Sequence, residues 1–431
     1  MDKNDSVIVK PARSVQGSVR VPGDKSISHR YAMLAALAKG STQLSNYSTA
    51  ADCISTLNCM RDLGASWERT SAGDIEIRGC NSALRAPVNC LDCGNSGSTI
   101  RMLSGILAGQ QFSSELFGDE SLSRRPMERV ISPLTKMGAR IFALEGGRPP
   151  LRITGTRLHA IDYNLPIASA QVKTAILFAG LQAEGETKIT EPVRTRDHTE
   201  LALRAFGVDI HQHGLSVRIQ GGQSLNAIAV QIPGDLSSAA FFLCAAAIFP
   251  DSHLILDQVL MNPTRARLLD WLAAAGLRIS VIQIEEHHGE LIGTLEVHGG
   301  NFKGGVIHDS DIAALIDEIP VLAAIAPYSE NGLVFRNAKE LRVKESDRIS
   351  SIAAGLHAMG ARFEEHDDGL TIPGRQNLHG AEVNSFGDHR IAMAFAIAAL
   401  RASGETQIAG ASASAVSFPA FFELLANVTK Y

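Results

Sequence analysis

The sequence predicts a mixed α/β fold of two similar domains, each containing three βαβαββ repeats. Three observations lead to this prediction. Six stretches run from small or polar residues into almost wholly apolar helices, each followed by a β-like piece and a second, amphipathic helix. Most of these second helices end at a glycine, and one short sequence frame occurs once in each half of the chain. One supersecondary unit copied six times accounts for all three observations.

The six apolar helices are expected to be buried, because a helix that is apolar on nearly all sides must lie inside a domain. The stretches are DKSISHRYAMLAALAKG, GNSGSTIRMLSGILAG, ASAQVKTAILFAGLQAEG, GDLSSAAFFLCAAAIFPD, IDEIPVLAAIAPYSENG and GDHRIAMAFAIAALRASG. The short β-like pieces that follow them, such as TQLSN, TKITE and TQIAG, predict a strand after each buried helix.

The second helix of five repeats is expected to end at a glycine, which readily adopts the left-handed conformation that often ends a helix. These residues are Gly64, Gly138, Gly207, Gly276 and Gly360. Alternating apolar and polar residues around a polar turn follow, as in GVDIHQHGLSVRIQG, and predict two further strands. The glycines recur roughly every seventy residues, which sets the length of the repeat.

The repeated frame predicts where the two domains meet along the chain. VRVPGDKSISHR spans Val19–Arg30, and VQIPGDLSSAAF spans Val230–Phe241. Because Pro-Gly marks a turn or hinge, each copy is expected to begin the first repeat of one domain, at a place where the chain crosses between domains. We therefore expect one domain from residues 1–20 with 235–431, containing repeats 4–6, and a second from 21–234, containing repeats 1–3.

Composition excludes several classes of protein. A formal net charge of −5 and an aromatic content of 5% argue against general nucleic-acid binding. The first residues lack the features of a signal or transit peptide, and the longest apolar run, Ala239–Pro250, is far short of the ~20 residues of a membrane span. We therefore expect a cytoplasmic protein without membrane association. Cys90 and Cys93 form a lone C-x-x-C, so no structural metal is expected from the cysteines.

Polar residues at the starts of the apolar helices indicate a site for small anions. A helix N-terminus presents free N–H groups and a positive partial charge. Lys25, Ser26 and Arg30 lie at the first start and Arg101 follows the second, whereas the fourth, GDLSSAAF, contains no cation. The loops SLSRRPMER, EPVRTRDHTE and LRVKESDR add further Lys and Arg residues, which suit phosphate and carboxylate. The alternative for each loop alone is a solvated charged surface.

Three residues beside these cations are candidate acid–base groups, namely Asp317, Glu345 and His389. The alternative for each is a helix cap or a salt bridge. The sequence contains no nucleophile elbow, phosphate-binding Walker loop or dinucleotide fingerprint.

Seven motifs, in order along nearly the whole chain, resemble the 5-enolpyruvylshikimate-3-phosphate (EPSP) synthases, in the style of the bacterial class II enzymes. They are PGDKSISHR, GNSGSTIR, RRPM, SAQVK, TRDHTE, RVKESDR and GDHRIAM. The resemblance implies an inverted α/β barrel in each domain and an active site in the cleft between domains. It implies transfer of the enolpyruvyl group of phosphoenolpyruvate to the 5-hydroxyl of shikimate 3-phosphate, with release of phosphate, on the way to chorismate and aromatic amino acids. It also implies a tetrahedral intermediate, no metal or organic cofactor, no nucleic-acid partner, and a clamp that can work as a monomer.

The resemblance also implies roles for individual residues. Those that match the phosphoenolpyruvate site are Lys25, Gly97, Arg125, Gln171, Arg348 and Arg390. Those that match the shikimate 3-phosphate site are Lys25, Ser26, Arg30, Ser169, Ala170, Gln171, Arg196, Asp317 and Lys344. Asp317 would be the base on the 5-hydroxyl, and Glu345, aided by Lys25 and His389, the proton donor to the methylene carbon. Glycine rather than alanine at residue 97 leads us to expect competition by glyphosate at the phosphoenolpyruvate site.

Two alternatives remain at this point. UDP-N-acetylglucosamine enolpyruvyl transferases share the six-repeat fold and place a reactive cysteine, occasionally an aspartate, in the loop of the second repeat. Here SSELFGDESLSRRP has no cysteine, but Asp119 could be the aspartate variant. The other alternative is an inactive binding protein on the same scaffold.

Overall fold

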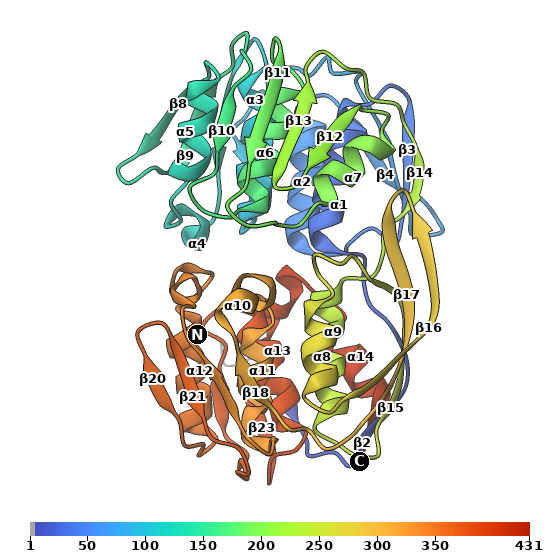
Figure 1. The fold of residues 1–431 in the computed structure, drawn as a ribbon, viewed down its shortest axis with the longest axis vertical. Helices are drawn as coiled ribbons and strands as arrows, with labels where there is room; N and C mark the ends of the chain where they lie inside the picture. Colours follow the sequence, from blue (N-terminus) through green and yellow to red (C-terminus); the bar gives the residue numbers. More distant parts are fainter. Residues whose placement is uncertain (1–4) are drawn as a thin grey trace. The chain divides into compact units, whose positions relative to one another are not determined.

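The computed structural model describes residues 5–431, which divide into two compact units (Figure 1). Unit 1 comprises residues up to Pro22 together with Pro233–Glu285 and Leu291–Tyr431, and unit 2 comprises Gly23–Ile232 together with Glu286–Glu290. The expected boundaries lay after residues 20 and 234, and residues 1–4 lie outside the described residues. The turn at 286–290 groups with unit 2, although sequence analysis assigned it to the other domain.

Unit 2 contains three four-stranded sheets in its described residues, in the orders β14-β3-β5-β4, β6-β7-β9-β8 and β10-β11-β13-β12. In each sheet the first two strands are parallel and the other neighbours are antiparallel. The strands are β3 (Ser41–Ser45), β4 (Ser66–Arg69), β5 (Ile75–Arg78), β6 (Leu91–Asp92), β7 (Ser113–Phe117), β8 (Arg140–Leu144), β9 (Arg148–Thr154), β10 (Asp162–Asn164), β11 (Glu186–Thr190), β12 (Ile210–His213), β13 (Ser216–Gln220) and β14 (Ala229–Gln231).

Helices α1 (Lys25–Leu37), α3 (Gly97–Ala108) and α6 (Ala170–Gly180) are the apolar helices of unit 2, and most of their residues are buried. The sheets lie around them (Figure 1). The remaining helices are α2 (Ala51–Asp62), α4 (Glu120–Ser123), α5 (Glu128–Lys136) and α7 (His198–Ala205). The second and third repeats follow the predicted βαβαββ order, with a short extra helix, α4, in the second.

Unit 1 also contains three sheets in its described residues, with four, three and five strands in the orders β18-β19-β21-β20, β1-β23-β22 and β16-β17-β15-β2-β24. Its strands are β1 (Ser6–Val9), β2 (Ser14–Arg20), β15 (His253–Leu260), β16 (Arg278–His287), β17 (Glu290–His298), β18 (Gly305–Ile307), β19 (Leu333–Phe335), β20 (Glu364–His366), β21 (Gly369–Ile372), β22 (Glu382–Asn384), β23 (Thr406–Ala409) and β24 (Thr429–Lys430). Its helices are α8 (Leu236–Ala247), α9 (Arg267–Ala274), α10 (Asp309–Leu315), α11 (Ile319–Ile325), α12 (Arg348–Ala358), α13 (His389–Ala399) and α14 (Phe421–Val428), with 3₁₀ turns at Ala326–Tyr328, Lys339–Val343 and Ala411–Val416.

The two copies of the Pro-Gly-Asp frame lie where the chain passes from one unit to the other, at Pro22–Gly23 and Ile232–Pro233. The strand before each copy pairs with the strand that follows the buried helix of the other copy: β2 is parallel to β15, and β14 is parallel to β3. The first repeat of each unit therefore obtains its first strand from the segment that precedes the other copy of the frame. The repeated sequence frame is thus a structural feature of the chain crossing.

Side chains that cap the buried helices explain why these helices begin where they do. Asp24, Ser96, Ser169, Asp235 and Asp388 each accept a hydrogen bond from a backbone N–H of the first turn of α1, α3, α6, α8 and α13, respectively. The five glycines predicted to end second helices all have positive φ, between 77° and 111°. Glycine is favoured there because a side chain would be strained in that conformation.

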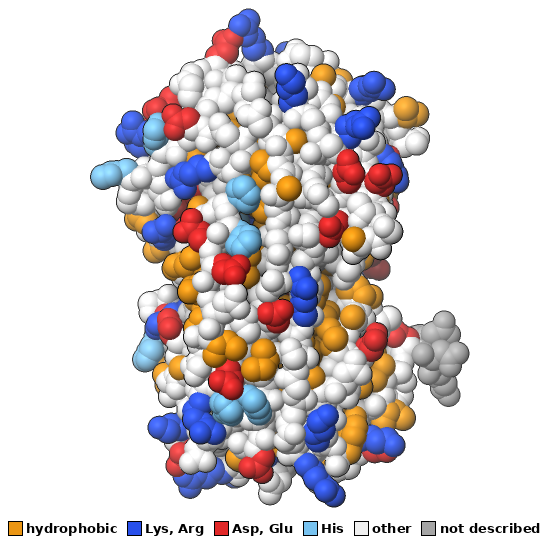
Figure 2. Space-filling view, turned by 90° about the vertical axis from the view of Figure 1, so that its right-hand side faces the viewer, with side chains coloured by type: hydrophobic (Ala, Val, Ile, Leu, Met, Phe, Trp, Pro, Cys, Tyr) orange, Lys and Arg blue, Asp and Glu red, His pale blue; other side chains and the backbone are white. Residues whose placement is uncertain are grey.

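Figure 2 shows one face of the molecule, on which basic and acidic side chains are interspersed. Within residues 5–431, none of the helices has the length and apolar character needed to cross a membrane.

Candidate active site

Lys25 is the first residue of α1, and its ammonium group is held by a carboxylate. Its Nζ atom lies 2.9 Å from Oδ2 of Asp52, at the start of α2. The Lys25 side chain is 20% exposed, whereas that of Asp52 is only 8% exposed. The Asp52 carboxylate therefore holds the Lys25 ammonium group beside the N-terminus of α1. The ammonium group and the helix N-terminus both contribute positive potential there. Sequence analysis did not identify Asp52, since no motif marks it.

Arg30 lies one turn further along α1 and is almost completely buried, at 3% exposed. Its Nη1 donates to the Ser26 carbonyl at 2.7 Å, Nε donates to Oγ1 of Thr199 at 2.6 Å, and Nη2 donates to Oγ1 of Thr174 at 2.8 Å. Burial lowers the pKa of Arg30 to about 10, although Glu200 acts in the opposite direction. These contacts join the predicted residues Ser26 and Arg30 to α6 and α7.

A second group forms where α3 faces α6. Gly97 is the first residue of α3, and a Cβ atom there would lie 3.0 Å from Nη1 of Arg101 and 3.2 Å from Nη1 of Arg125. Arg101 donates to Oε1 of Gln171 at 2.8 Å, and Gln171 donates through Nε2 to Oγ of Ser98 at 2.8 Å. The structure thus brings Gly97, Arg125 and Gln171 together, with Arg101 as the connecting residue.

The other predicted residues of unit 2 lie at the starts of α6 and α7. Ser169 caps α6 and Ala170 is its first residue, and both are half-buried. Arg196 lies in the loop before α7, also half-buried, and its charge is one of the influences that lower the pKa of Arg30.

A buried ionic cluster lies behind these helix starts. Nζ of Lys173 is 3.0 Å from Oε2 of Glu191 and 2.7 Å from Oε1 of Glu200, and all three side chains are at most 1% exposed. Burial raises the pKa of Glu200, whereas Lys173 acts to lower it. Nδ1 of His198 lies 2.6 Å from Oε1 of Glu290, the first residue of β17. Sequence analysis quoted SAQVK and TRDHTE but did not identify the cluster, because its members are separated along the chain.

Arg348 is the centre of the predicted site residues of unit 1. Its guanidinium is 1% exposed and contacts three carboxylates: Oδ2 of Asp388 at 2.8 Å from Nε, Oε2 of Glu345 at 2.6 Å from Nη2, and Oδ1 of Asp317 at 3.9 Å from Nη1. Burial opposes the charged form of Arg348, but Asp388 and Glu345 outweigh it and raise the pKa above its ordinary value. Burial likewise opposes ionisation of Asp388, yet Arg348 holds its pKa below the ordinary value.

Arg390 and His389 belong to the same part of unit 1. Arg390 donates through Nη1 to the Asp317 carbonyl at 2.6 Å, and its backbone N–H donates to Asp388, the N-cap of α13. His389, the first residue of α13, is 2% exposed. Lys344 is paired instead with Glu340, at 3.4 Å. Asp317, Glu345, Arg348 and Arg390 are therefore joined by direct contacts, with Asp388 as the buried residue that links them.

The fourth helix start lacks a cation of its own, as the sequence indicated, but a cation reaches it from elsewhere in unit 1. Arg265 is 4% exposed, donates through Nη2 to Oγ of Ser237 at 2.6 Å, and lies 3.6 Å from Oε1 of Glu318. Ser237 in turn donates to Glu318. No sequence pattern identified Arg265.

Asp119 has a local structural role. Its Oδ1 accepts the N–H of Leu122 at 2.8 Å as the N-cap of α4, and its Oδ2 accepts from Asn95 at 2.6 Å. A carboxylate used in this way is a helix cap, which weakens its interpretation as a reactive aspartate.

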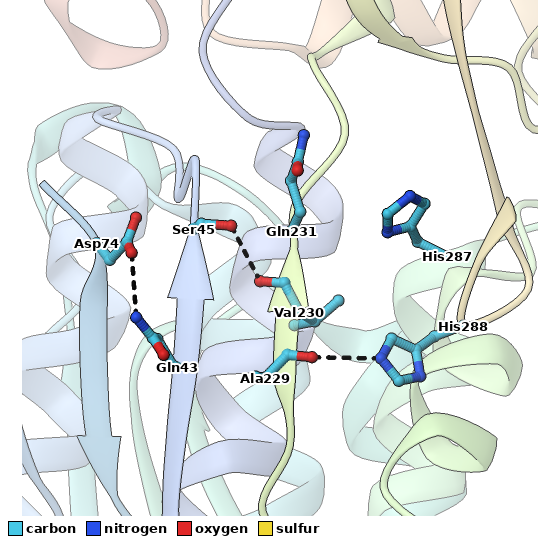
Figure 3. Close-up of a pocket in the computed structure, with 8 residues that line it drawn as sticks. All are labelled: Gln43, Ser45, Asp74, Ala229, Val230, Gln231, His287 and His288. Carbon is cyan, nitrogen blue, oxygen red and sulfur yellow. Dashed lines mark hydrogen bonds between the residues drawn. The ribbon is translucent and has the colours of Figure 1, made fainter. Parts of the chain in front are cut away.

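A separate pocket of about 300 Å³ lies at one edge of unit 2 (Figure 3). Its walls are β3, β14 and the turn at 286–290, with Asp74 just before β5. His288 contacts the Ala229 carbonyl at 3.4 Å, and Gln43 donates to Asp74 at 3.2 Å. None of the predicted site residues lines this pocket.

Comparison with known proteins places the chain in a family. The family model described as EPSP synthase (3-phosphoshikimate 1-carboxyvinyltransferase) matches residues 9–425. Among curated relatives, the 3-phosphoshikimate 1-carboxyvinyltransferase of Koribacter versatilis (strain Ellin345) is 55% identical over 425 residues, 99% of each chain. That of Solibacter usitatus (strain Ellin6076) is 52% identical over 432 residues, 100% of each chain.

Solved structures agree with this result. An EPSP synthase from Acinetobacter baumannii has a TM-score of 0.88 and 42% identity, with 98% of each chain covered. The enolpyruvyl transferase NikO from Streptomyces tendae has a TM-score of 0.81 but only 19% identity, over 98% of this chain and 97% of the other, and it shows the fold alone.

The fold and the full-length matches to EPSP synthases place the chain among the enolpyruvyl transferases. Within that class, the chain belongs to the EPSP synthase family. It is a 3-phosphoshikimate 1-carboxyvinyltransferase (EC 2.5.1.19), an enzyme of the shikimate pathway of aromatic amino acid biosynthesis. This confirms the predicted fold class and function over both alternatives. Its substrates as a member of this family are phosphoenolpyruvate and shikimate 3-phosphate.

Proposed function

We propose that the residues predicted from the sequence bind the two substrates. Those assigned to phosphoenolpyruvate are Lys25, Gly97, Arg125, Gln171, Arg348 and Arg390. Those assigned to shikimate 3-phosphate are Lys25, Ser26, Arg30, Ser169, Ala170, Gln171, Arg196, Asp317 and Lys344. Each set contains residues of both units. The contacts among these residues within each unit support the assignment.

Electrostatics explains why the reaction needs this arrangement. Both substrates carry a phosphate and a carboxylate, so they repel each other in water. Buried arginines such as Arg30 and Arg348 are already oriented by their protein partners, so they offset that repulsion without further reorganisation. The same cations stabilise the negative charge that develops on the departing phosphate. Two reactants held together also gain the advantage of an intramolecular reaction.

We further propose an addition–elimination sequence. Asp317 removes the proton of the 5-hydroxyl as its oxygen bonds to C2 of phosphoenolpyruvate, while Glu345 gives a proton to C3, with Lys25 and His389 assisting. Loss of phosphate and of a proton from C3 then restores the enol ether double bond. The observation that carries this assignment is the contact of Arg348 with both Glu345, at 2.6 Å, and Asp317, at 3.9 Å. One buried guanidinium thus places two carboxylates beside each other for separate proton transfers.

The test is release of phosphate from phosphoenolpyruvate, with shikimate 3-phosphate or UDP-N-acetylglucosamine as acceptor. Wild type should release phosphate from phosphoenolpyruvate when shikimate 3-phosphate is the acceptor, but not when UDP-N-acetylglucosamine is. Lys25→Ala and Glu345→Ala should each lower kcat/KM by about 10²-fold or more, since charge stabilisation and general acid catalysis are each of that size.

Matched controls come from an exposed ion pair, Lys10 and Glu405, whose side chains are 65% and 57% exposed. Lys10→Ala and Glu405→Ala should retain wild-type rates. Normal rates in Lys25→Ala or Glu345→Ala would refute the role of that residue while leaving the family activity intact. The cytoplasmic location and monomeric state expected from the sequence also remain predictions.

A further inference from the structure

Three side chains of unit 1 come together on the outer face of a sheet, in a way that substrate binding does not explain. They are His253 of β15 and Glu296 and His298 of β17. β15 and β17 are antiparallel, and His253 lies directly opposite His298. Glu296 is two residues before His298, so its side chain emerges on the same face of β17. Figure 2 shows histidine and acidic side chains side by side on the face it presents.

Residues on either side of these three confirm which face they occupy. Leu254 and Leu256 of β15 and Leu295 and Val297 of β17 are buried at 0% exposure, and they alternate with the three polar residues. The three side chains themselves are 50%, 33% and 39% exposed, in the order His253, Glu296 and His298. They are therefore accessible to an ion from solvent.

The geometry points to a metal ion. Nε2 of His253 lies 3.0 Å from Oε1 of Glu296, and Nε2 of His298 lies 3.5 Å from the same oxygen. One ligand atom from each residue lies within 4.8 Å of the others. Zinc bonds of about 2.0–2.1 Å in a tetrahedron separate ligand atoms by about 3.3 Å, so the two distances to Oε1 of Glu296 already suit a shared ion. The imidazole rings of His253 and His298 are stacked, with centroids 4.3 Å apart and an angle of 3° between their planes. Because each lone pair lies in its ring plane, one ring must rotate about its side-chain bonds before both can point at the same ion.

We propose that His253, Glu296 and His298 form a surface site for a divalent transition-metal ion such as Zn²⁺, separate from the residues assigned to the substrates. Two imidazoles and one carboxylate suit Zn²⁺ and its neighbours, whereas Mg²⁺ and Ca²⁺ prefer oxygen ligands alone. Three protein ligands leave a fourth coordination position for water. An ion bound here bridges β15 and β17, so it stabilises unit 1 against unfolding.

The first experiment measures Zn²⁺ binding to the full chain after removal of metal with a chelator. Competition with a chromophoric zinc indicator should show one tight equivalent in wild type. His253→Gln, His298→Gln and Glu296→Gln should each weaken it by at least about tenfold, because even residues that only support metal ligands have effects of this size. His211→Gln is the matched control, since His211 is an exposed histidine beside an acidic residue, Asp209, at 3.3 Å. Cys90→Ser tests an exposed thiol as the alternative ligand.

Two further measurements separate a metal site from a structural effect. Without metal, the three variants should melt at the wild-type temperature. Addition of Zn²⁺ should raise the melting temperature of wild type but not of His298→Gln. Co²⁺ should give the intense visible absorption of a four-coordinate site in wild type and in His211→Gln, but not in the variants of His253, Glu296 or His298. The proposal is overturned if no saturable binding occurs, if both histidine variants bind as wild type does, or if only Cys90→Ser loses binding.

Discussion

At the scale of single residues, the candidate site depends on cations that protein partners hold in place before substrate arrives. Lys25 is held by Asp52, Arg30 by two threonines and a carbonyl, and Arg348 by Asp388 and Glu345. The cations themselves could be found from the sequence, because they lie in short motifs at helix starts. Glu345 lies in the same motif as Arg348, but the more distant partners could not be found, because Asp52 and Thr199 become neighbours of Lys25 and Arg30 only in the folded chain.

Gly97→Ala should mainly affect phosphoenolpyruvate. The new methyl group would lie 3.0 Å from Arg101 and 3.2 Å from Arg125, and the flexible ends of both arginines would have to shift. We expect KM for phosphoenolpyruvate to rise about tenfold, the size of effect that one carbon in a binding pocket produces. Inhibition by glyphosate, if it competes at this site, should weaken as well. Steady-state kinetics with each substrate varied provides the test, and an equal rise in KM for shikimate 3-phosphate would contradict it.

Asp388→Asn should destabilise the protein in a pH-dependent way. Arg348 holds the pKa of Asp388 below its ordinary value of 3.8, so the ionised pair contributes stability above that pH and loses it as pH falls through the lower, folded-state value. The variant leaves the buried Arg348 with one fewer partner, which we expect to cost about 3 kcal/mol at neutral pH. Urea unfolding at pH 7 and at decreasing pH checks this. The gap between wild type and variant should narrow in acid, and a gap that widens would count against the assignment.

At the scale of elements, buried ion pairs connect the helices that carry the site. Lys173 on α6 binds Glu191, which follows β11, and Glu200 on α7. The apolar character of α6 predicts its burial correctly, but it gives no reason to expect a lysine at 0% exposure in the first turn of that helix. The reason is tertiary: two carboxylates from later elements meet the ammonium group inside unit 2.

Lys173→Met should lower the free energy of unfolding by about 3–5 kcal/mol, because it leaves two carboxylates buried without their cation. The triple variant Lys173→Met, Glu191→Gln, Glu200→Gln should recover part of this loss, since it removes the stranded charges too. Chemical denaturation of the three proteins measures both quantities. Lys188→Met is the control, because Lys188 forms a more exposed pair with Asp162. If Lys173→Met and Lys188→Met are equally mild, the buried cluster does not contribute as proposed.

At the scale of the whole molecule, the two Pro-Gly-Asp frames mark the places where the chain passes between units. Their glycines differ in their surroundings. A Cβ atom on Gly23 would lie 1.8 Å from the Asn46 carbonyl oxygen, whereas on Gly234 its nearest neighbours would be Val21 Cγ2 at 2.9 Å and the Gln258 carbonyl at 3.0 Å. The neighbour of Gly23 is a backbone oxygen, which cannot move easily. The nearest neighbour of Gly234 is a methyl group at the end of a side chain, which can.

Gly23→Ala should therefore destabilise the protein more than Gly234→Ala, by about 3 kcal/mol against about 1 kcal/mol. The two variants control for each other because they make the same change in the same sequence frame. Denaturation midpoints of the full chain give the comparison. A larger effect at Gly234 would show that the close approach at Gly23 is relieved in solution.

The sequence by itself determined the repeat, the six buried helices, the glycines at helix ends and the family, because each of these depends on local periodicity or on short contiguous motifs. Only the tertiary structure decided which strands pair at the crossing, since β2 joins β15 and β14 joins β3 although the partners are far apart along the chain. The tertiary structure also decided which residues contact the buried cations. It brought Arg265 into contact with Ser237 at the start of α8, and it placed His253, Glu296 and His298 close together. The physical reason is common to all of them. Hydrogen bonds and ion pairs act over a few ångströms in space, and residues far apart along the chain reach that distance only after the sheets and helices have packed.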